Sequence, residues 1–309
     1  MSEFTDPAHG HVPVLAEETL DLLAPAPGET LLDATLGRGG HAELLIPHLA
    51  PGGRYVGLDL DPGNIDYARQ RLEPLAAETG VRLDLVHASF QDARSVLDEL
   101  DIDRVHGLLA DLGFASTQMD EPGRGLSFAE QGPLDMRLDP TSPGPTAADL
   151  VNRLPPHDLA NLIYRYGEER LSRRIARKIV ERREESPIQT TAELAQIVRQ
   201  AYGPQARRSR IHPATRTFMA LRIAVNGELD ALDRLLSQLP ALLRGGGRTA
   251  IISFHSLEDR RVKQAFQRYE RDEAGRRLTR KPITPGEQEE LANPRSRSAK
   301  LRGCVWQAE

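Results

Sequence analysis

Residues 30–41 read TLLDATLGRGGH: a short apolar run, an acidic residue and then a glycine-rich loop. The apolar run, 30–34, follows a Pro-Gly turn and stops before Gly37, Gly39 and Gly40. Glycines allow the backbone to turn tightly and to approach a ligand closely. This stretch therefore predicts a buried strand followed by a ligand-binding loop.

Similar apolar runs recur along the chain, with amphipathic segments such as 41–49 and 64–72 between them. The runs are 54–60 (RYVGLDL), 83–87 (LDLVH), 105–112 (VHGLLADL), 248–254 (RTAIISF) and 300–306 (KLRGCVW). Alternating strands and helices are typical of βαβ units, which build a parallel sheet with helices on both faces. We therefore expect an α/β fold with a Rossmann-like sheet.

The alternation is interrupted in the middle of the chain. Turn-rich segments at 120–125 and 139–146 lead into a purely helical pattern that continues to about residue 203. A basic loop at 203–212 follows, and Pro213 then suits the first turn of one long helix that extends beyond Leu236. We expect a discontinuous sheet domain, 1–117 plus 214–309, and a small all-helical domain inserted at 118–213, with residues 271–294 as a loop.

The bulk composition describes a soluble globular protein of 309 residues, with 39% hydrophobic and 28% charged residues. No apolar run approaches the roughly 20 residues needed to span a bilayer, and the N-terminus does not resemble a signal peptide. The single cysteine, Cys304, can form neither an internal disulfide nor a zinc site alone. We expect a cytoplasmic protein with no membrane partner and no metal site.

Charge is distributed unevenly. Residues 1–120 hold 21 Asp and Glu against 7 Lys and Arg, a balance of −14, whereas the remaining 189 residues carry a balance of +9. Such asymmetry suggests two electrostatic roles, although chance clustering on solvated faces is the alternative.

Ligands of open parallel sheets bind beyond the carboxyl ends of the strands. Those ends carry Asp33, Asp59, Phe90 and Asp111. Asp59 lies about 20 residues after the glycine loop, where an acidic residue can accept hydrogen bonds from a ribose, and Phe90 could lie against an adenine. Three carboxylates disfavour the pyrophosphate of a dinucleotide and favour the sulfonium and ammonium of S-adenosylmethionine.

Several longer strings resemble the bacterial RsmH (MraW) family over nearly the whole chain. They are 37–41 (GRGGH), 111–120 (DLGFASTQMD), 132–139 (GPLDMRLD), 166–170 (YGEER), 212–222 (HPATRTFMALR), 225–228 (VNGE) and 251–260 (IISFHSLEDR). The resemblance implies a class I methyltransferase that modifies the exocyclic N4 amine of a decoding-region cytidine in 16S ribosomal RNA. Phe114, Ala115 and Thr117 depart from the family pattern DLGVSSPQ, which puts the positioning of the target base in doubt.

The resemblance also implies a set of residues that contact S-adenosylmethionine. They are Gly39, Gly40, His41, Asp59, Phe90, Asp111 and Gln118. For the chemistry we select Asp111, Ser116 and His255, because the ends of the fourth and fifth predicted strands should border the target amine. A structural hydrogen-bonding role is the equal alternative for His255.

Methylation of an amino nitrogen needs no covalent intermediate, whereas methylation of a pyrimidine carbon needs a cysteine nucleophile. Cys304 lies in the last predicted strand and outside any loop motif, so we expect it to be a packed residue. The sequence thus predicts direct displacement.

Two basic segments could contact RNA. One is a helix with seven basic residues: Arg170, Arg173, Arg174, Arg177, Lys178, Arg182 and Arg183. Interspersed glutamates make an ordinary solvated face the alternative for this helix, whereas the loop with Arg207, Arg208 and Arg210 lacks carboxylates among its arginines. We expect 16S rRNA, within the small ribosomal subunit, as the partner and no DNA, and leave a homodimer open. A nicotinamide-dependent oxidoreductase and a non-catalytic RNA-binding factor are the alternatives.

Overall fold

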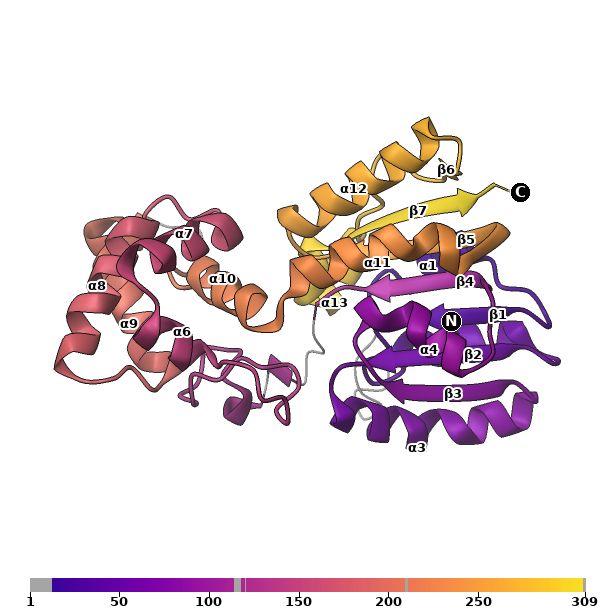
Figure 1. Ribbon diagram of the computed structural model, residues 1–309, viewed down its shortest axis with the longest axis horizontal. Helices are drawn as coiled ribbons and strands as arrows, with labels where there is room; N and C mark the ends of the chain where they lie inside the picture. Colours follow the sequence, from indigo (N-terminus) through magenta and orange to yellow (C-terminus); the bar gives the residue numbers. More distant parts are fainter. Residues whose placement is uncertain (1–12, 114–117, 120, 209–210, 308–309) are drawn as a thin grey trace. The chain divides into compact units, whose positions relative to one another are not determined.

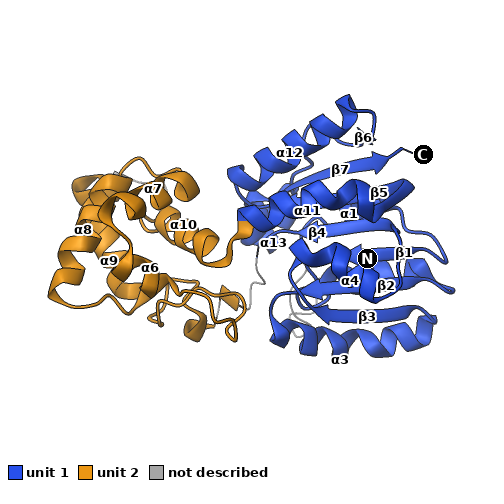
Figure 2. Cartoon of the chain, in the orientation of Figure 1, with its two compact units in different colours: residues 1–113, 229–309 blue, residues 114–228 orange. Residues whose placement is uncertain are grey.

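The chain forms two compact units in the computed structural model, which describes residues 13–113, 118–119, 121–208 and 211–307. Unit 1 comprises residues 1–113 and 229–309, and unit 2 comprises residues 114–228 (Figure 2). Unit 2 is thus inserted between two parts of unit 1.

Unit 1 is built on a sheet whose described residues form seven strands in the order β3-β2-β1-β4-β5-β7-β6. The strands are β1 (Thr30–Asp33), β2 (Arg54–Asp59), β3 (Arg82–His87), β4 (Val105–Asp111), β5 (Leu243–Ser253), β6 (Gly275–Arg277) and β7 (Lys300–Trp306). β1 to β5 pair in parallel, and β7 pairs antiparallel with both β5 and β6. The α/β sheet predicted from the alternating pattern is confirmed.

Helices cover both faces of this sheet (Figure 1). One face packs on α4 (Ala93–Glu99), α11 (Glu228–Leu242) and α12 (Ser256–Arg271). The other packs on α1 (Ala16–Leu23), α2 (Gly40–Leu45), the 3-10 turn η2 (Ile46–Leu49) and α3 (Pro62–Thr79). Neighbouring side chains on a strand point to opposite faces, so Leu31 joins the second core and Leu32 the first.

The register of the sheet brings three acidic residues to one edge. Asp33 at the end of β1 lies beside Leu109 of β4, two residues before Asp111. Asp59 ends β2, which pairs with β1 on its other side. Because parallel strands end at the same edge, Asp33, Asp59 and Asp111 share the carboxyl edge of the sheet.

Unit 2 is a helical bundle around its own core. The α-helices with fully described bounds in this unit are α6 (Ala147–Arg153), α7 (Pro156–Gly167), α8 (Ser172–Glu185), α9 (Thr191–Tyr202) and α10 (Thr215–Asn226). Gly167 lets α7 approach α10 closely, because a Cβ at this position would lie 2.6 Å from the carbonyl oxygen of Arg216. The described residues of this unit form no extended strand, only an isolated bridge between Pro133 and Thr190.

The boundary after unit 2 differs from the expected one. The long helix expected from Pro213 is two helices, α10 and α11, separated by Gly227 with φ of 61°. Glycine adopts this left-handed conformation without steric cost, so it ends α10 after Asn226. As a result α10 packs in unit 2, which extends to residue 228 instead of 213.

The expectation of a loop over residues 271–294 is wrong in two places. β6 (Gly275–Arg277) adds an edge strand to β7, and α13 (Glu287–Ala292) forms a short helix. Three strand residues are too few to show alternation, and α13 buries none of its residues, so neither produced a periodic pattern.

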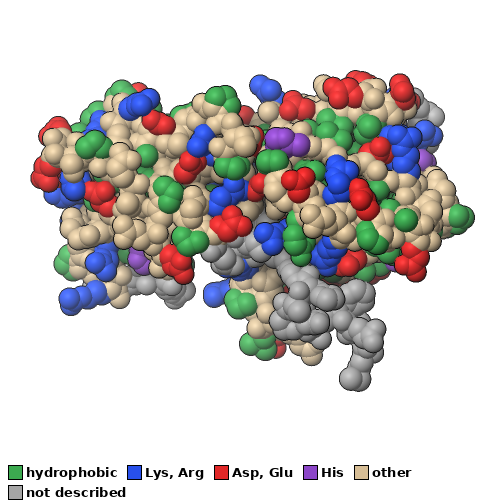
Figure 3. Space-filling model, turned by 90° about the horizontal axis from the view of Figure 1, so that it is seen from below, with side chains coloured by type: hydrophobic (Ala, Val, Ile, Leu, Met, Phe, Trp, Pro, Cys, Tyr) green, Lys and Arg blue, Asp and Glu red, His purple; other side chains and the backbone are tan. Residues whose placement is uncertain are grey.

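The surface mixes charges of both signs. On the face drawn in Figure 3, basic and acidic side chains are interspersed. Every helix of the described chain is too short or too polar to cross a membrane.

Candidate active site at the carboxyl edge of the sheet

The loop between β1 and α2 is shaped by glycines. Gly37 and Gly39 have φ of 54° and 83°, in the left-handed region that side chains other than glycine rarely adopt. A Cβ at Gly39 would also lie 3.0 Å from the side chain of Leu72 in α3. The loop is therefore a compact turn that leads directly into Gly40 and His41 at the start of α2.

Asp59, at the end of β2, holds this loop. Its Oδ2 accepts a hydrogen bond from the backbone N–H of Gly37 at 2.8 Å. Its Oδ1 accepts from the N–H of Asp61 at 2.8 Å and from the side-chain amide of Asn64 at 3.2 Å. Burial raises the pKa of this carboxyl. A carboxylate offers about four acceptor positions, so one remains for a ligand hydroxyl.

A second network connects β1, β2 and β4. The fully buried hydroxyl of Tyr55 donates to Asp33 Oδ2 at 2.7 Å, and Asp33 Oδ1 accepts from the backbone N–H of Thr35 at 3.0 Å. The hydroxyl of Thr35 in turn accepts from the N–H of Asp111 at 2.6 Å. Burial raises the pKa of Asp33 to about 6, although the bonds from Tyr55 and Thr35 oppose this shift.

His41 and Asp111 face each other across the edge, with 3.6 Å between His41 Nε2 and Asp111 Oδ2. His41 is buried, and neither of its ring nitrogens makes a hydrogen bond with a described residue. Asp111 Oδ1 is likewise without one. Unsatisfied buried polar atoms are costly, so this cluster has the character of a site that a ligand completes.

These groups fit S-adenosylmethionine. Asp33, Asp59 and Asp111 provide a negative environment for its sulfonium and ammonium, and the unpartnered atoms of His41 and Asp111 could accept or donate hydrogen bonds. The glycine loop supplies a backbone that a ligand can approach.

Phe90 follows β3 and opens the 3-10 turn η3 (Phe90–Asp92). The N–H of Ala88 donates to the carbonyl of Asp59 at 3.0 Å, which ties this segment to the end of β2. The half-buried ring packs against the core of unit 1 and keeps part of its surface exposed. Phe90 thus lies at the same edge as Asp59, as predicted.

The roles of Gln118 and Ser116 beside this cluster stay predictions. Gln118 is buried and belongs to unit 2. Ser116 and the departures Phe114, Ala115 and Thr117 lie outside the described residues.

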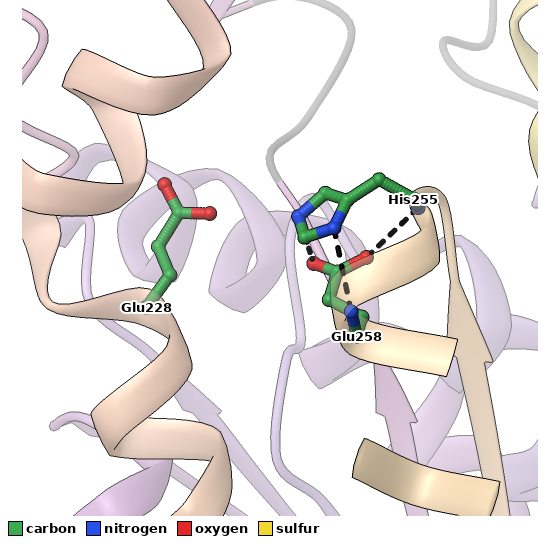
Figure 4. A group of neighbouring side chains, drawn as sticks. All are labelled: Glu228, His255 and Glu258. Atoms are coloured by element: carbon green, nitrogen blue, oxygen red, sulfur yellow. Dashed lines mark hydrogen bonds and ion pairs between the residues drawn. The ribbon is translucent and has the colours of Figure 1, made fainter. Parts of the chain in front are cut away.

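His255 follows β5 and caps α12 (Figure 4). Its Nδ1 accepts from the backbone N–H of Glu258 at 3.4 Å, and its Nε2 lies 3.2 Å from Glu258 Oε1. Glu258 Oε2 accepts from the N–H groups of Phe254 and His255, at 2.9 and 3.2 Å. The structural role considered for His255 is therefore observed, as a capping box, and its catalytic role stays a prediction. Glu228, also drawn in Figure 4, belongs to unit 2, where Arg222 binds both of its oxygens at 2.7 Å.

Cys304 is fully buried in β7, and burial raises the pKa of its thiol to about 12. A thiol that stays protonated and inaccessible cannot act as a nucleophile. The structure thus agrees with the expectation of a packed residue.

Thr35 and Tyr55 also belong to the network around Asp33 and Asp111, and the sequence did not predict either of them. The spacing of Asp33 and Thr35 could have predicted the bond between them, because an aspartate side chain often accepts from the backbone N–H two residues later. Nothing local to β2 distinguishes Tyr55 from an ordinary core residue.

Known proteins are similar to this chain over nearly all of its length. The profile of the MraW methylase family matches residues 8–306. Ribosomal RNA small subunit methyltransferase H of Sorangium cellulosum is 49% identical over 294 residues, covering 95% of this chain and 90% of that protein. The protein of the same name from Synechococcus sp. (strain CC9311) is 51% identical over 301 residues, covering 96% and 93%.

Among solved structures, the precorrin-6y C5,15-methyltransferase of Geobacter metallireducens has 9% identity and a TM-score of 0.46, covering 98% of this chain and 96% of that one. The predicted class I methyltransferase fold and the methyl donor S-adenosylmethionine are both confirmed. With a match over nearly all of its length, the chain belongs to the MraW methylase family.

Proposed function

We propose that the chain methylates small-subunit ribosomal RNA, at the exocyclic N4 amine of a cytidine in 16S rRNA. The observation that carries the substrate class is the identity of 49% and 51% to two proteins named ribosomal RNA small subunit methyltransferase H, over 95% and 96% of this chain. Membership of a methylase family argues against the nicotinamide-dependent alternative.

We propose an amino nitrogen as the methylated atom because the chain lacks an accessible cysteine nucleophile. The chain's one cysteine is buried in β7, so no thiol is available to attack a pyrimidine ring. An amino group needs only alignment with the methyl group that S-adenosylmethionine supplies, and an acceptor for the proton that it loses.

The residues of unit 1 divide this work. Asp59 holds the glycine loop and retains one acceptor position for a ribose hydroxyl, and Phe90 offers a ring face to an adenine. His41 and Asp111 bind the charged end of the methyl donor. The backbone that follows Asp111 holds the target amine, with Ser116 contributing to its position.

Unit 2 recognises the RNA in this proposal. Arg207 in the basic loop is exposed, whereas Arg210 and the side chain of Arg208 lie outside the described residues. The substrate is the RNA of the small subunit in the cytoplasm, and sedimentation of the purified chain distinguishes a monomer from a homodimer.

The test is mass-spectrometric mapping of methylated cytidines in 16S rRNA from cells with and without this protein. We expect one cytidine to lose an N4-methyl group in the absence of the protein and to regain it when purified chain and methyl donor are added. Normal methylation without the protein would contradict the proposal. Binding of rRNA without transfer of tritiated methyl groups would favour the non-catalytic RNA-binding factor.

A further inference from the structure

The basic side chains of α8 fall into two groups. In the C-terminal half they are engaged within unit 2: Arg182 pairs with Glu193 at 2.7 Å, and Arg183 donates to the carbonyl of Val151 at 2.7 Å. In the N-terminal half Arg173, Arg174 and Arg177 are exposed, and none makes an ion pair or hydrogen bond with another described residue. The structure thus separates a neutralised half of the helix from a half with free positive charge.

Two of these free arginines line a groove between α7 and α8. The hollow has a volume of about 330 Å³ and lies entirely within unit 2. Ala160 and Val180 contribute apolar surface, and Arg173 and Arg177 are one helical turn apart along its wall. Such a combination suits a ligand with a flat apolar body and an anionic group.

The charges along the groove are not evenly distributed. Glu181 and Glu184 line it at positions further along α8 than the arginines, and Glu181 is neutralised by Lys178 at 2.6 Å. Anions are therefore favoured toward Arg173 and Arg177, and amino groups toward Glu184.

An exposed aromatic residue extends the same face of α7. His157 and Asn161 line the groove, and Tyr164 continues their spacing of i, i+4 and i+7. Tyr164 is 62% exposed, an unusual position for a large aromatic side chain. Exposed aromatic rings beside arginines are typical of surfaces that bind unpaired bases.

We propose that the groove between α7 and α8 binds an unpaired nucleotide of the substrate RNA, separate from the base that is methylated. Arg173 and Arg177 hold its phosphates, while the base lies against the apolar wall and Tyr164. This inference rests on the proposed function, because it assumes that RNA is the substrate.

The experiment compares two double variants of the full chain with equal loss of charge. Arg173→Ala/Arg177→Ala removes the groove arginines, and Arg153→Ala/Arg199→Ala removes two exposed arginines of unit 2 outside the groove. Binding of 16S rRNA and KM for methyl transfer are measured at several salt concentrations, with donor affinity and melting temperature as checks on folding.

We expect the groove variant to raise KM about tenfold or more and to reduce the salt slope by about 1.4, the value for two lost single-strand phosphate contacts. Donor affinity should stay at the wild-type value. Tyr164→Ala should also raise KM. Tyr164→Phe should keep the wild-type KM, because its ring can still stack.

Equal effects from the two double variants, or a wild-type KM in the groove variant, would overturn the groove site while the proposed function stood. A defect with assembled subunits but none with naked RNA would assign the groove to a ribosomal protein, and so would also overturn it. Failure of the wild-type chain to methylate rRNA would instead contradict the proposed function.

Discussion

The hydroxyl of Thr35 accepts a 2.6 Å hydrogen bond from the backbone N–H of Asp111, and so joins the ends of β1 and β4. The backbone of Thr35 is itself held by Asp33. The position of Asp111 therefore depends directly on the hydroxyl of Thr35, and indirectly on the Asp33 carboxylate that holds Thr35.

Thr35→Ala should displace Asp111 and reduce both donor affinity and turnover, by about tenfold, because small errors of alignment are costly in group transfer. Thr35→Ser keeps the hydroxyl and should behave like the wild type. Calorimetry with S-adenosylmethionine and single-turnover assays check both. Equal losses in the two variants would show that the methyl group of Thr35 matters instead of its hydrogen bond.

Asp111→Asn should lower kcat/KM by about 100-fold or more with little change in melting temperature. The reason is that Oδ1 of Asp111 makes no hydrogen bond with a described residue and Oδ2 only faces His41 at 3.6 Å, so the fold gains little from the charge of Asp111. Turnover and thermal unfolding measured on the same preparation check this. An early-melting variant with normal turnover would make Asp111 a structural residue.

Asp33 should make stability depend on pH. Its pKa is about 6 in the folded chain and 3.8 for an ordinary aspartate, so the folded state binds more protons between these values. The stability that this proton provides is complete below pH 4 and is lost as pH rises to about 6, a change of about 3 kcal/mol. Asp33→Asn should therefore gain stability relative to the wild type over this range. Urea unfolding at pH 4, 5, 6 and 7 gives the difference, and parallel curves for the two proteins would rule out this titration.

Gly167→Ala should destabilise unit 2 by about 1–3 kcal/mol, because the added Cβ would meet the carbonyl oxygen of Arg216 at 2.6 Å. Gly123→Ala is the matched control, since a Cβ there meets nothing within 4 Å. Thermal unfolding of both variants checks the close approach of α7 and α10. Similar melting temperatures for the two would mean that the helices can separate at little cost.

Cys304→Ala should retain near-normal methyl transfer, because displacement by an amino nitrogen uses no thiol. A small loss of stability is expected, since the residue is fully buried in β7. Methyl-transfer assays at saturating donor and RNA measure the effect. An inactive but folded variant would disprove direct displacement.

The sequence was sufficient for those parts of the fold that repeat. The strands ending at Asp33, Asp59 and Asp111 are short apolar runs that alternate with helical segments, and parallel pairing then places their carboxylates at one edge. The break between α10 and α11 at Gly227 was not predicted, because both helices carry apolar stripes and one glycine inside a helical pattern is often tolerated.

The site was predictable only in part, for a similar reason. The glycine loop and the acidic residues follow from their place after strands, whereas the bond from Tyr55 to Asp33 joins residues 22 positions apart. The capping role of His255 was one of two roles left open by the sequence, and it is the geometry of Glu258 that reveals it.

The insertion of unit 2 also imposes an order on folding during synthesis. Gly107 of β4 pairs with Arg248 of β5, 141 positions later, so the centre of the sheet cannot close until the whole of unit 2 has left the ribosome. Helical bundles have mostly local contacts and fold quickly, whereas pairing of distant strands is slow. The nascent chain therefore exposes the open edge of β4 while unit 2 is made. We expect β5 and β7 to complete the sheet last.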